Sequence, residues 1–253
     1  MSSLRTVWIT ALVVGGALPG GLAAAEAPLV VPGFSGDPLG APPPIWQFAG
    51  LAHQTKPRTQ FQIVEDEGTH VLQVASDHSY GNLALMGRRN LSLRTRLAWR
   101  WKLDVPNLSA NLRTRAGDDA PVKVCLAFDY DSGGLSFGER TELQIARMNY
   151  PIPVPIATLC YVWDHQLPAG TALANAFTDR IRYIVLESGE ARLHSWVTQE
   201  RNIMEDFWKT FGPEFQAKAP DDLPELIGVL VGGDADNTGE VTSAEVGDIR
   251  LED

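Results

Sequence analysis

One eight-residue segment constrains the fold of this chain more than any other. Residues 96–103 alternate between large apolar and basic side chains, with Leu97, Trp99, Trp101 and Leu103 set against Arg96, Arg100 and Lys102. A period of two places these sets on opposite faces of a β-strand. Because the apolar face must be buried, the segment predicts a sheet that packs against a second layer.

The rest of the chain reads mainly as further short strands. Thr59 to Val64 and Val71 to Val74 flank the turn residues 65–68 and predict a hairpin, and other β-rich runs are 122–128, 182–186, 226–231 and 246–251. Helical spacing is confined to 139–148 and 203–211. Short strands without β-helix-β alternation predict an all-β, antiparallel jelly-roll-like β-sandwich with one or two short helices.

The N-terminal region predicts export. A weakly basic start, the short apolar run 7–18 and the small residues Ala23 and Ala25 are typical of a cleaved signal peptide, so we expect residues 1–25 to be removed. Residues 26–45 are rich in Pro and Gly and predict an extended lead-in outside the core. A single β-sandwich domain is then expected over 46–253, in a periplasmic or secreted protein that does not insert into the membrane after cleavage.

Charge and cysteine content narrow the classes of partner. The 253-residue chain carries a formal net charge of −10, which repels phosphate backbones and disfavours nucleic acid as a partner. Its two cysteines, Cys125 and Cys160, both lie in strand-like segments. In an oxidising compartment they either form a disulfide or remain two buried thiols, and the sequence leaves both open.

Several motifs together resemble an uncharacterised bacterial family of exported proteins, a domain of unknown function. The motifs are Leu97-Ala98-Trp99-Arg100-Trp101-Lys102, Gly117-Asp118-Asp119, Leu159-Cys160-Tyr161-Val162-Trp163, Glu200-Arg201-Asn202, Asp234-Ala235-Asp236-Asn237-Thr238-Gly239 and Gly247-Asp248-Ile249. The resemblance implies export and the fold, and no reaction. The entry strand and the closing segment 247–251 are more distantly similar to the first and last strands of carbohydrate-binding jelly rolls, a similarity of fold that does not by itself fix function.

The segment Asp234 to Glu245 has the oxygen spacing of a twelve-residue calcium loop. The predicted calcium ligands are Asp234, Asp236, Thr238, the carbonyl of Glu240, and Glu245. Strands rather than helices are expected on both sides, so the ion would lie in a strand-to-strand connection. The alternative is a turn in which Asp and Asn side chains hydrogen-bond their own backbone.

Aromatic and charged residues supply the candidates for glycan binding. We expect Trp99 and Trp101 to lie in the core. Trp163 and Trp196 are followed by polar residues and are the predicted stacking platforms, with Arg113 and Asp206 as partners for sugar hydroxyls. The alternative assignment of these residues is to the core and to solvated loops.

Two carboxylate-rich segments supply candidates for catalysis. Asp118 and Asp119 in one, and Glu200 and Arg201 in the other, would have to meet across a sheet to act in acid/base chemistry. Ion pairs that anchor loops are the favoured alternative. We therefore expect a glycan-binding protein rather than an enzyme, with a polysaccharide hydrolase or lyase, or a structural envelope protein, as the alternatives. No feature of the sequence indicates an oligomeric state.

Overall fold

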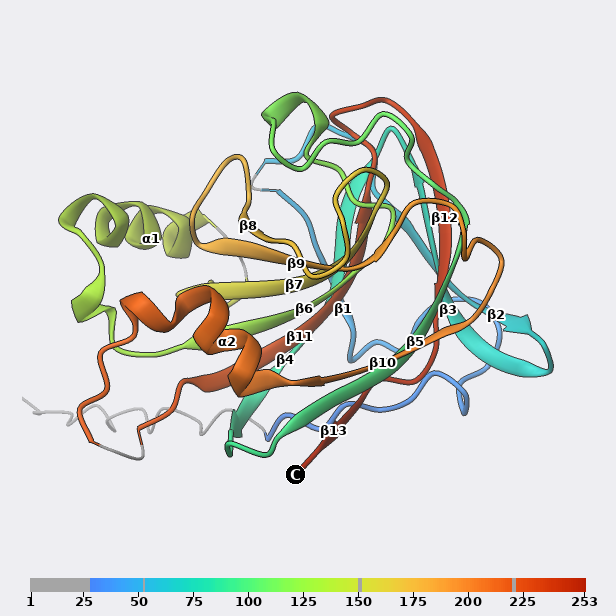
Figure 1. Cartoon of the computed structure of the whole chain (residues 1–253). Coiled ribbons are helices and arrows are strands. Elements are labelled where there is room, and N and C mark those ends of the chain that lie inside the picture. The colour runs from blue at the N-terminus through green and yellow to red at the C-terminus, as the bar shows by residue number, and fades with distance from the viewer. Residues whose placement is uncertain (1–27, 52, 150–151, 220–221) are drawn as a thin grey trace, which may run out of the picture.

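A computed structural model describes residues 28–51, 53–149, 152–219 and 222–253. These residues form a β-sandwich of the predicted jelly-roll-like class, with two curved sheets facing each other and two short α-helices (Figure 1). The predicted signal peptide and its cleavage site lie outside the described residues. Within them, no helix has the length and apolar character needed to cross a bilayer.

The larger sheet has seven strands in the order β1-β4-β11-β6-β7-β9-β8. Their bounds are β1 Gln47–Ala49, β4 Tyr80–Asn90, β11 Glu225–Asp234, β6 Lys123–Asp129, β7 Ala157–Asp164, β9 Ile181–Ser188 and β8 Ala172–Ala174. All neighbours are antiparallel except β7 and β9, which run parallel. This parallel pair is the one exception to the antiparallel pairing expected from the sequence.

The smaller sheet has six strands, five of them in the order β10-β5-β12-β3-β2, while the sixth, β13, pairs with β5. Their bounds are β10 Val197–Asn202, β5 Arg96–Val105, β12 Val241–Val246, β3 Thr69–Asp77, β2 Gln60–Asp66 and β13 Arg250–Glu252. The predicted hairpin is β2–β3, and its turn places Glu67 and Gly68 at positive φ. The predicted strand 246–251 is wrong, because the chain leaves β12 after Val246 and starts β13 only at Arg250.

The core lies between the two sheets. Strand β5 contributes Trp99 and Trp101, which pack on Tyr161 and Trp163 of β7 with ring centroids 5.2 and 6.1 Å apart. The predicted core assignment of Trp99 and Trp101 is confirmed, since both are almost fully buried. The alternation in residues 96–103 reflects this packing directly.

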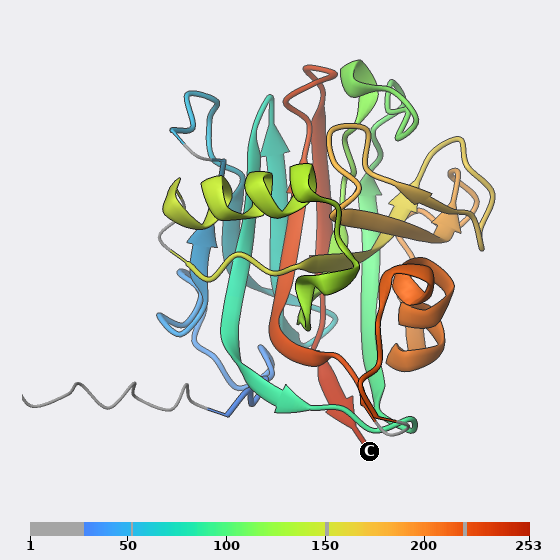
Figure 2. The ribbon, with the colours of Figure 1, turned by 90° about the vertical axis from the view of Figure 1, so that its left-hand side faces the viewer.

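Both predicted helices form, and they lie on the same side of the molecule (Figure 1). Helix α2 (Ile203–Phe211) begins where the Asn202 side chain accepts hydrogen bonds from two backbone N–H groups, and it is followed by Gly212 and Pro213. Phe207 of this helix packs against Phe128 in the core, with the two ring centroids 5.0 Å apart. Helix α1 (Phe137–Asn149) lies across the outer side of the seven-stranded sheet (Figure 2).

Two features of the core differ from the sequence prediction or were left open by it. The lead-in was expected outside the core, yet Leu29 and Phe34 are buried in it, with Phe34 packed on Trp46. Large apolar side chains among the prolines explain this difference. Cys125 and Cys160 are directly paired across β6 and β7 and form a disulfide, which the sequence alone could not decide.

Candidate functional site

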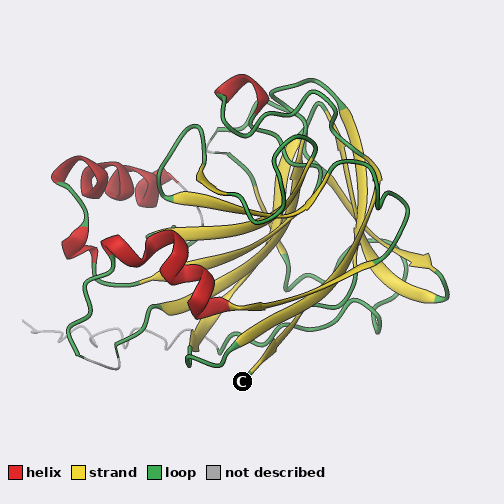
Figure 3. Cartoon of the chain, viewed as in Figure 1, coloured by secondary structure: helices red, strands yellow, loops and turns green. Residues whose placement is uncertain are grey.

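An aromatic ring stands on the outer face of the six-stranded sheet. Trp196 is half-buried and precedes β10. Its indole Nε1 donates a hydrogen bond to Asp66 Oδ2 over 2.7 Å, and the guanidinium of Arg100 lies 4.2 Å from its ring centroid. These contacts hold the ring in one orientation while part of it stays open to solvent. Figure 3 shows no helix against this face in the described part of the chain. We call Trp196, Arg100, Lys102 and Asp66 the Trp196 site.

Lys102 lies among three carboxylates, of which Asp66 belongs to the Trp196 site. Its Nζ lies 2.8 Å from Asp66 Oδ1, 3.6 Å from Glu245 Oε2 and 3.9 Å from Asp104 Oδ2. Burial raises the pKa of Glu245 to about 8, and the neighbouring Asp104 contributes to this rise. Burial also disfavours the charged form of Asp104, but hydrogen bonds with Glu245 and His194 keep the pKa of Asp104 below its ordinary value. Glu245 and Asp104 therefore share one proton near neutral pH.

A surface hollow of about 420 Å³ extends from Arg100, the residue that stacks on Trp196. Its lining includes one acidic residue, Asp248, and two basic ones, Arg100 and Arg250, together with hydroxyl groups. The full set is Ser35, Thr69, His70, Trp99, Arg100, Thr198, Gly247, Asp248 and Arg250. One wall is fixed, because Ser35 donates to Asp248 through both its backbone N–H and its hydroxyl. The hollow and Trp196 therefore adjoin at Arg100, which lines the hollow and stacks on the Trp196 ring.

Trp163, the other predicted stacking platform, does not lie on a surface. Its side chain is only 1% exposed and packs between the sheets against Trp101. The indole Nε1 donates to the carbonyl of Gly189, which satisfies its polar atom inside the protein. The prediction for Trp163 is wrong because the sequence shows only its polar neighbours, whereas the strand direction points the ring inward.

Asp206, a predicted hydroxyl partner, is also internal. It is buried on α2, and its carboxylate accepts hydrogen bonds from Tyr161 Oη at 2.9 Å and from two nitrogens of Arg201 at 2.8 and 2.6 Å. This bidentate pair fixes α2 to β10 and explains the Arg201–Asp206 spacing. Glu200 points the other way and pairs with exposed Arg96 at 3.1 Å.

The predicted catalytic set therefore does not assemble. Asp118 and Asp119 lie beside the start of β6, whereas Glu200 and Arg201 lie on β10 of the other sheet and have separate partners. Burial raises the pKa of Asp118 to about 6, and Asp234 adds to the effect. Asp118 accepts a hydrogen bond from Asn175. Arg113, the remaining predicted ligand residue, is exposed on the loop before these aspartates.

The predicted calcium ligands are only partly brought together. Asp234 and Asp236 lie close to each other, and Asp119 joins them from a distant segment. Thr238 donates its hydroxyl to Asp119. The carbonyl of Glu240 accepts from His78 N, and Glu245 faces Lys102 on the six-stranded sheet. The last two residues point elsewhere because β12 carries the chain away from the loop.

Lys123 is one residue near this carboxylate cluster that the sequence interpretation missed. It is buried and pairs with Asp234, and the ring centroid of Tyr80 lies 5.2 Å from its Nζ. The pKa of Lys123 is raised despite burial, because Asp234 stabilises the ammonium. A lysine inside the apolar run 122–128 was the available signal.

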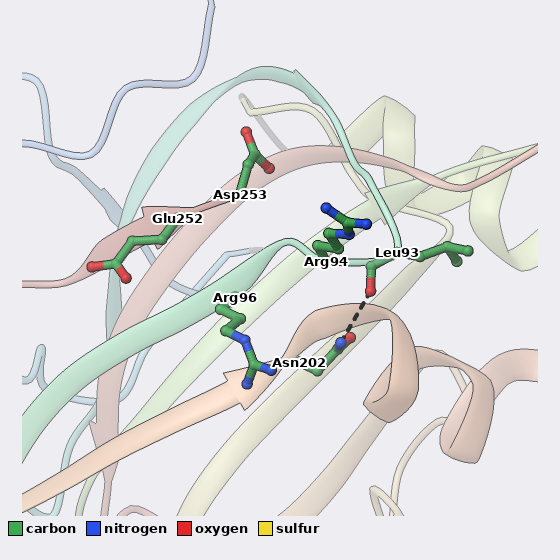
Figure 4. A pocket seen from close by; sticks show the side chains of 6 residues that line it. All are labelled: Leu93, Arg94, Arg96, Asn202, Glu252 and Asp253. Atoms are coloured by element: carbon green, nitrogen blue, oxygen red, sulfur yellow. Dashed lines mark hydrogen bonds between the residues drawn. The ribbon is translucent and has the colours of Figure 1, made fainter.

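A second hollow of about 300 Å³ lies near the C-terminus (Figure 4). It is lined by Leu93, Arg94, Arg96, Asn202, Glu252 and Asp253. Several of these groups already have structural partners: Asn202 Nδ2 donates to the carbonyl of Leu93, and Asp253 accepts from Thr95 and Arg89. This arrangement ties chain segments together and offers few free groups to a ligand.

Most of the chain matches one known protein family. Residues 45–250 match the model of the family described as "Protein of unknown function (DUF3047)". The chain belongs to this family. The motif resemblance to an uncharacterised family is confirmed to this extent, while export stays a prediction. The chain has no match among the curated proteins.

Solved structures give weak similarities only. The chain is similar to the glycoside hydrolase domain of Endo-D from Streptococcus pneumoniae R6, with 8% identity, a TM-score of 0.33, and coverage of 82% of this chain and 21% of that one. The Emp47p carbohydrate recognition domain gives 12% identity, a TM-score of 0.40 and coverage of 93% and 98%. A family 12 xyloglucanase from Bacillus licheniformis gives 7% identity and a TM-score of 0.39, with coverage of 81% of this chain and 100% of that one. The chain spans about a fifth of the Endo-D domain's length.

Proposed function

We propose that the protein is an exported carbohydrate-binding protein and that the Trp196 site, together with the adjoining hollow, binds the glycan. The observation that carries the proposal is the half-buried Trp196 ring, held by Asp66 and Arg100 beside a hollow of about 420 Å³. This volume falls within the roughly 300–1,000 Å³ common for small-ligand sites.

The chemistry of the surface suits a sugar. The C–H face of a pyranose packs against an indole ring, while carboxylates accept and guanidinium groups donate hydrogen bonds to hydroxyls. Trp196 supplies the ring, and Arg100, Asp248 and Thr198 supply both kinds of hydrogen-bonding group. Since Trp196 is already oriented by its own contacts, little side-chain freedom is lost on binding.

The disulfide supports the export part of the proposal. Cys125 and Cys160 are the only cysteines of the chain, and they are paired with each other. Stable disulfides form mainly in exported proteins, because the cytosol keeps thiols reduced. A periplasmic or secreted location also matches a polysaccharide ligand outside the cell membrane.

Binding has more support than catalysis. The predicted catalytic residues lie on separate sheets. Near Trp196, the protonated member of the carboxyl pair is Glu245, but its side chain is only 8% exposed. A glycosidic oxygen needs direct access to its proton donor. Hydrolase or lyase activity therefore stays the second candidate.

The test is retention on immobilised polysaccharides after a glycan-array screen of the mature protein. We expect the wild type to be retained by at least one polysaccharide and Trp196→Ala to lose retention, while Trp196→Phe keeps part of it because the aromatic face remains. Trp208→Ala is the matched control, since Trp208 is 38% exposed on α2, away from the site. Equal retention of wild type and Trp196→Ala, or no glycan bound by the wild type, would contradict the proposal.

A further inference from the structure

Three carboxylates from two distant segments meet beside the start of β6. Asp119 lies in the loop before β6, Asp234 ends β11, and Asp236 lies in the loop before β12. One oxygen of each lies within 4.8 Å of those of the other two. Calcium–oxygen distances are about 2.3–2.6 Å, so two ligands on opposite sides of one ion are about 5 Å apart. The three oxygens therefore fit around a single ion.

One oxygen in this cluster has nothing to bind. The side chain of Asp236 is 7% exposed, and its Oδ1 is buried without a hydrogen-bond partner among the described residues. Its other oxygen lies 3.9 Å from Nζ of Lys56, a side chain that is half exposed. Beside the cluster, Oδ1 of buried Asp118 also lacks a partner. A buried carboxylate oxygen without a hydrogen-bond partner is costly, and a bound cation would remove this cost for both oxygens.

The charge balance agrees. Asp118, Asp119, Asp234 and Asp236 are opposed by two lysines, Lys123 on Asp234 and Lys56 on Asp236. The remaining net charge of −2 would be balanced by one divalent cation. All candidate ligands are carboxylate oxygens, which favour calcium or magnesium over softer metals.

The other ligands are held in position without the ion. Asp119 accepts hydrogen bonds from the backbone and side chains of Asn237 and Thr238, which fix the loop that carries Asp236. Asp234 accepts from Ala120 N over 2.7 Å and pairs with Lys123. Calcium accepts flexible oxygen geometries whereas magnesium demands a near-ideal octahedron, so carboxylates already held by other contacts favour calcium.

We propose that Asp119, Asp234 and Asp236 form a calcium site that ties the β11–β12 loop to the segment before β6. This ligand set differs from the twelve-residue loop expected from the sequence, because Asp119 enters from more than a hundred residues away while Thr238, Glu240 and Glu245 serve other contacts. The site lies apart from Trp196, and the proposal stands whether or not that surface binds a glycan.

The test uses the mature protein, stripped with chelator and titrated with calcium chloride. Equilibrium dialysis should show one calcium ion per chain, and the melting temperature should rise to a plateau because the ion binds only the folded state. Asp236→Asn keeps the shape of the side chain and removes its charge, and it should weaken calcium binding by about tenfold or more. Exposed Asp179→Asn removes the same charge elsewhere and should bind calcium as the wild type does.

Three results would overturn the proposal. The first is a wild type that neither takes up calcium nor changes its melting temperature up to millimolar calcium. The second is undiminished uptake by folded Asp236→Asn, which would place the ion elsewhere. The third is equal or greater stabilisation by magnesium. If Asp236→Asn does not fold, the dialysis and melting measurements on the wild type still decide the question of uptake.

Discussion

The two sheets share one core but differ in their outer faces. In the seven-stranded sheet, β6 and β7 are buried at nearly every position, because Leu112, Ala120 and Leu167 cover the outer face around the disulfide. In the six-stranded sheet, β2 and β10 alternate between covered and open positions. An aromatic residue on β6 or β7 is therefore structural, whereas one on the open face is available to a ligand.

The sharpest test of this comparison is to truncate one tryptophan from each sheet. Trp163→Ala removes a ring that is 1% exposed in the core, and it should lower the free energy of unfolding by about 3–5 kcal/mol. Trp196→Ala removes a half-buried ring and should cost about 1 kcal/mol. Urea unfolding of both variants measures the two values. Equal costs would break the distinction between the closed and the open face.

The disulfide gives the next largest effect. It lies on the covered outer face of the seven-stranded sheet and links residues 35 positions apart. Replacing both cysteines by alanine should lower the free energy of unfolding by about 3–4 kcal/mol, because the unfolded chain gains freedom. Denaturation with and without reductant measures this, and the double variant should not respond to reductant. A loss below about 1 kcal/mol would show that the burial of this face, rather than the covalent link, sustains it.

The smallest effect concerns the open face and its dependence on pH. Burial, aided by Asp104, raises the pKa of Glu245 from 4.5 to about 8. The folded state therefore binds this proton more tightly than the unfolded state, so its stabilising contribution is complete below about pH 4.5 and is lost as the pH rises to about 8. Lys102 and Asp66 are the other charged groups that influence Glu245.

Glu245→Gln stays neutral at every pH and should remove this contribution to the slope. The melting temperature of the wild type should fall by roughly 5–10 °C more than that of Glu245→Gln between about pH 5 and pH 8. Thermal melts in matched buffers measure the difference. Parallel curves for the two proteins would show that the Glu245 carboxyl titrates like an exposed one and that this face is more open than its burial indicates.

The sequence predicted the fold well where burial is one-sided. Strand β5 shows this best, since its Leu and Trp residues all face the core and its Arg and Lys residues all face outward. The same reasoning failed for Trp163. Strand β7 is buried on both faces, so its sequence has no alternation to reveal the direction of each side chain.

The candidate site was predictable only in part. Trp196 was found because polar residues follow it, and Asp234 and Asp236 were found because they are close in sequence. Asp66 as the partner of Trp196, and Asp119 as the third carboxylate, were not predicted for these roles. Each lies more than a hundred positions from its partner, and no local pattern predicts such a contact.

The sequence by itself determined the fold class, the two helices and the strands with one buried face, because hydrophobic periodicity and helix-ending residues act locally. Tertiary structure decided the pairing of Cys125 with Cys160, the burial of Trp163 but the partial exposure of Trp196, and the meeting of Asp119 with Asp234 and Asp236. These depend on which strands become neighbours and on how their faces turn. That choice is made by packing the whole core, since each strand can bury its apolar side chains only against the others.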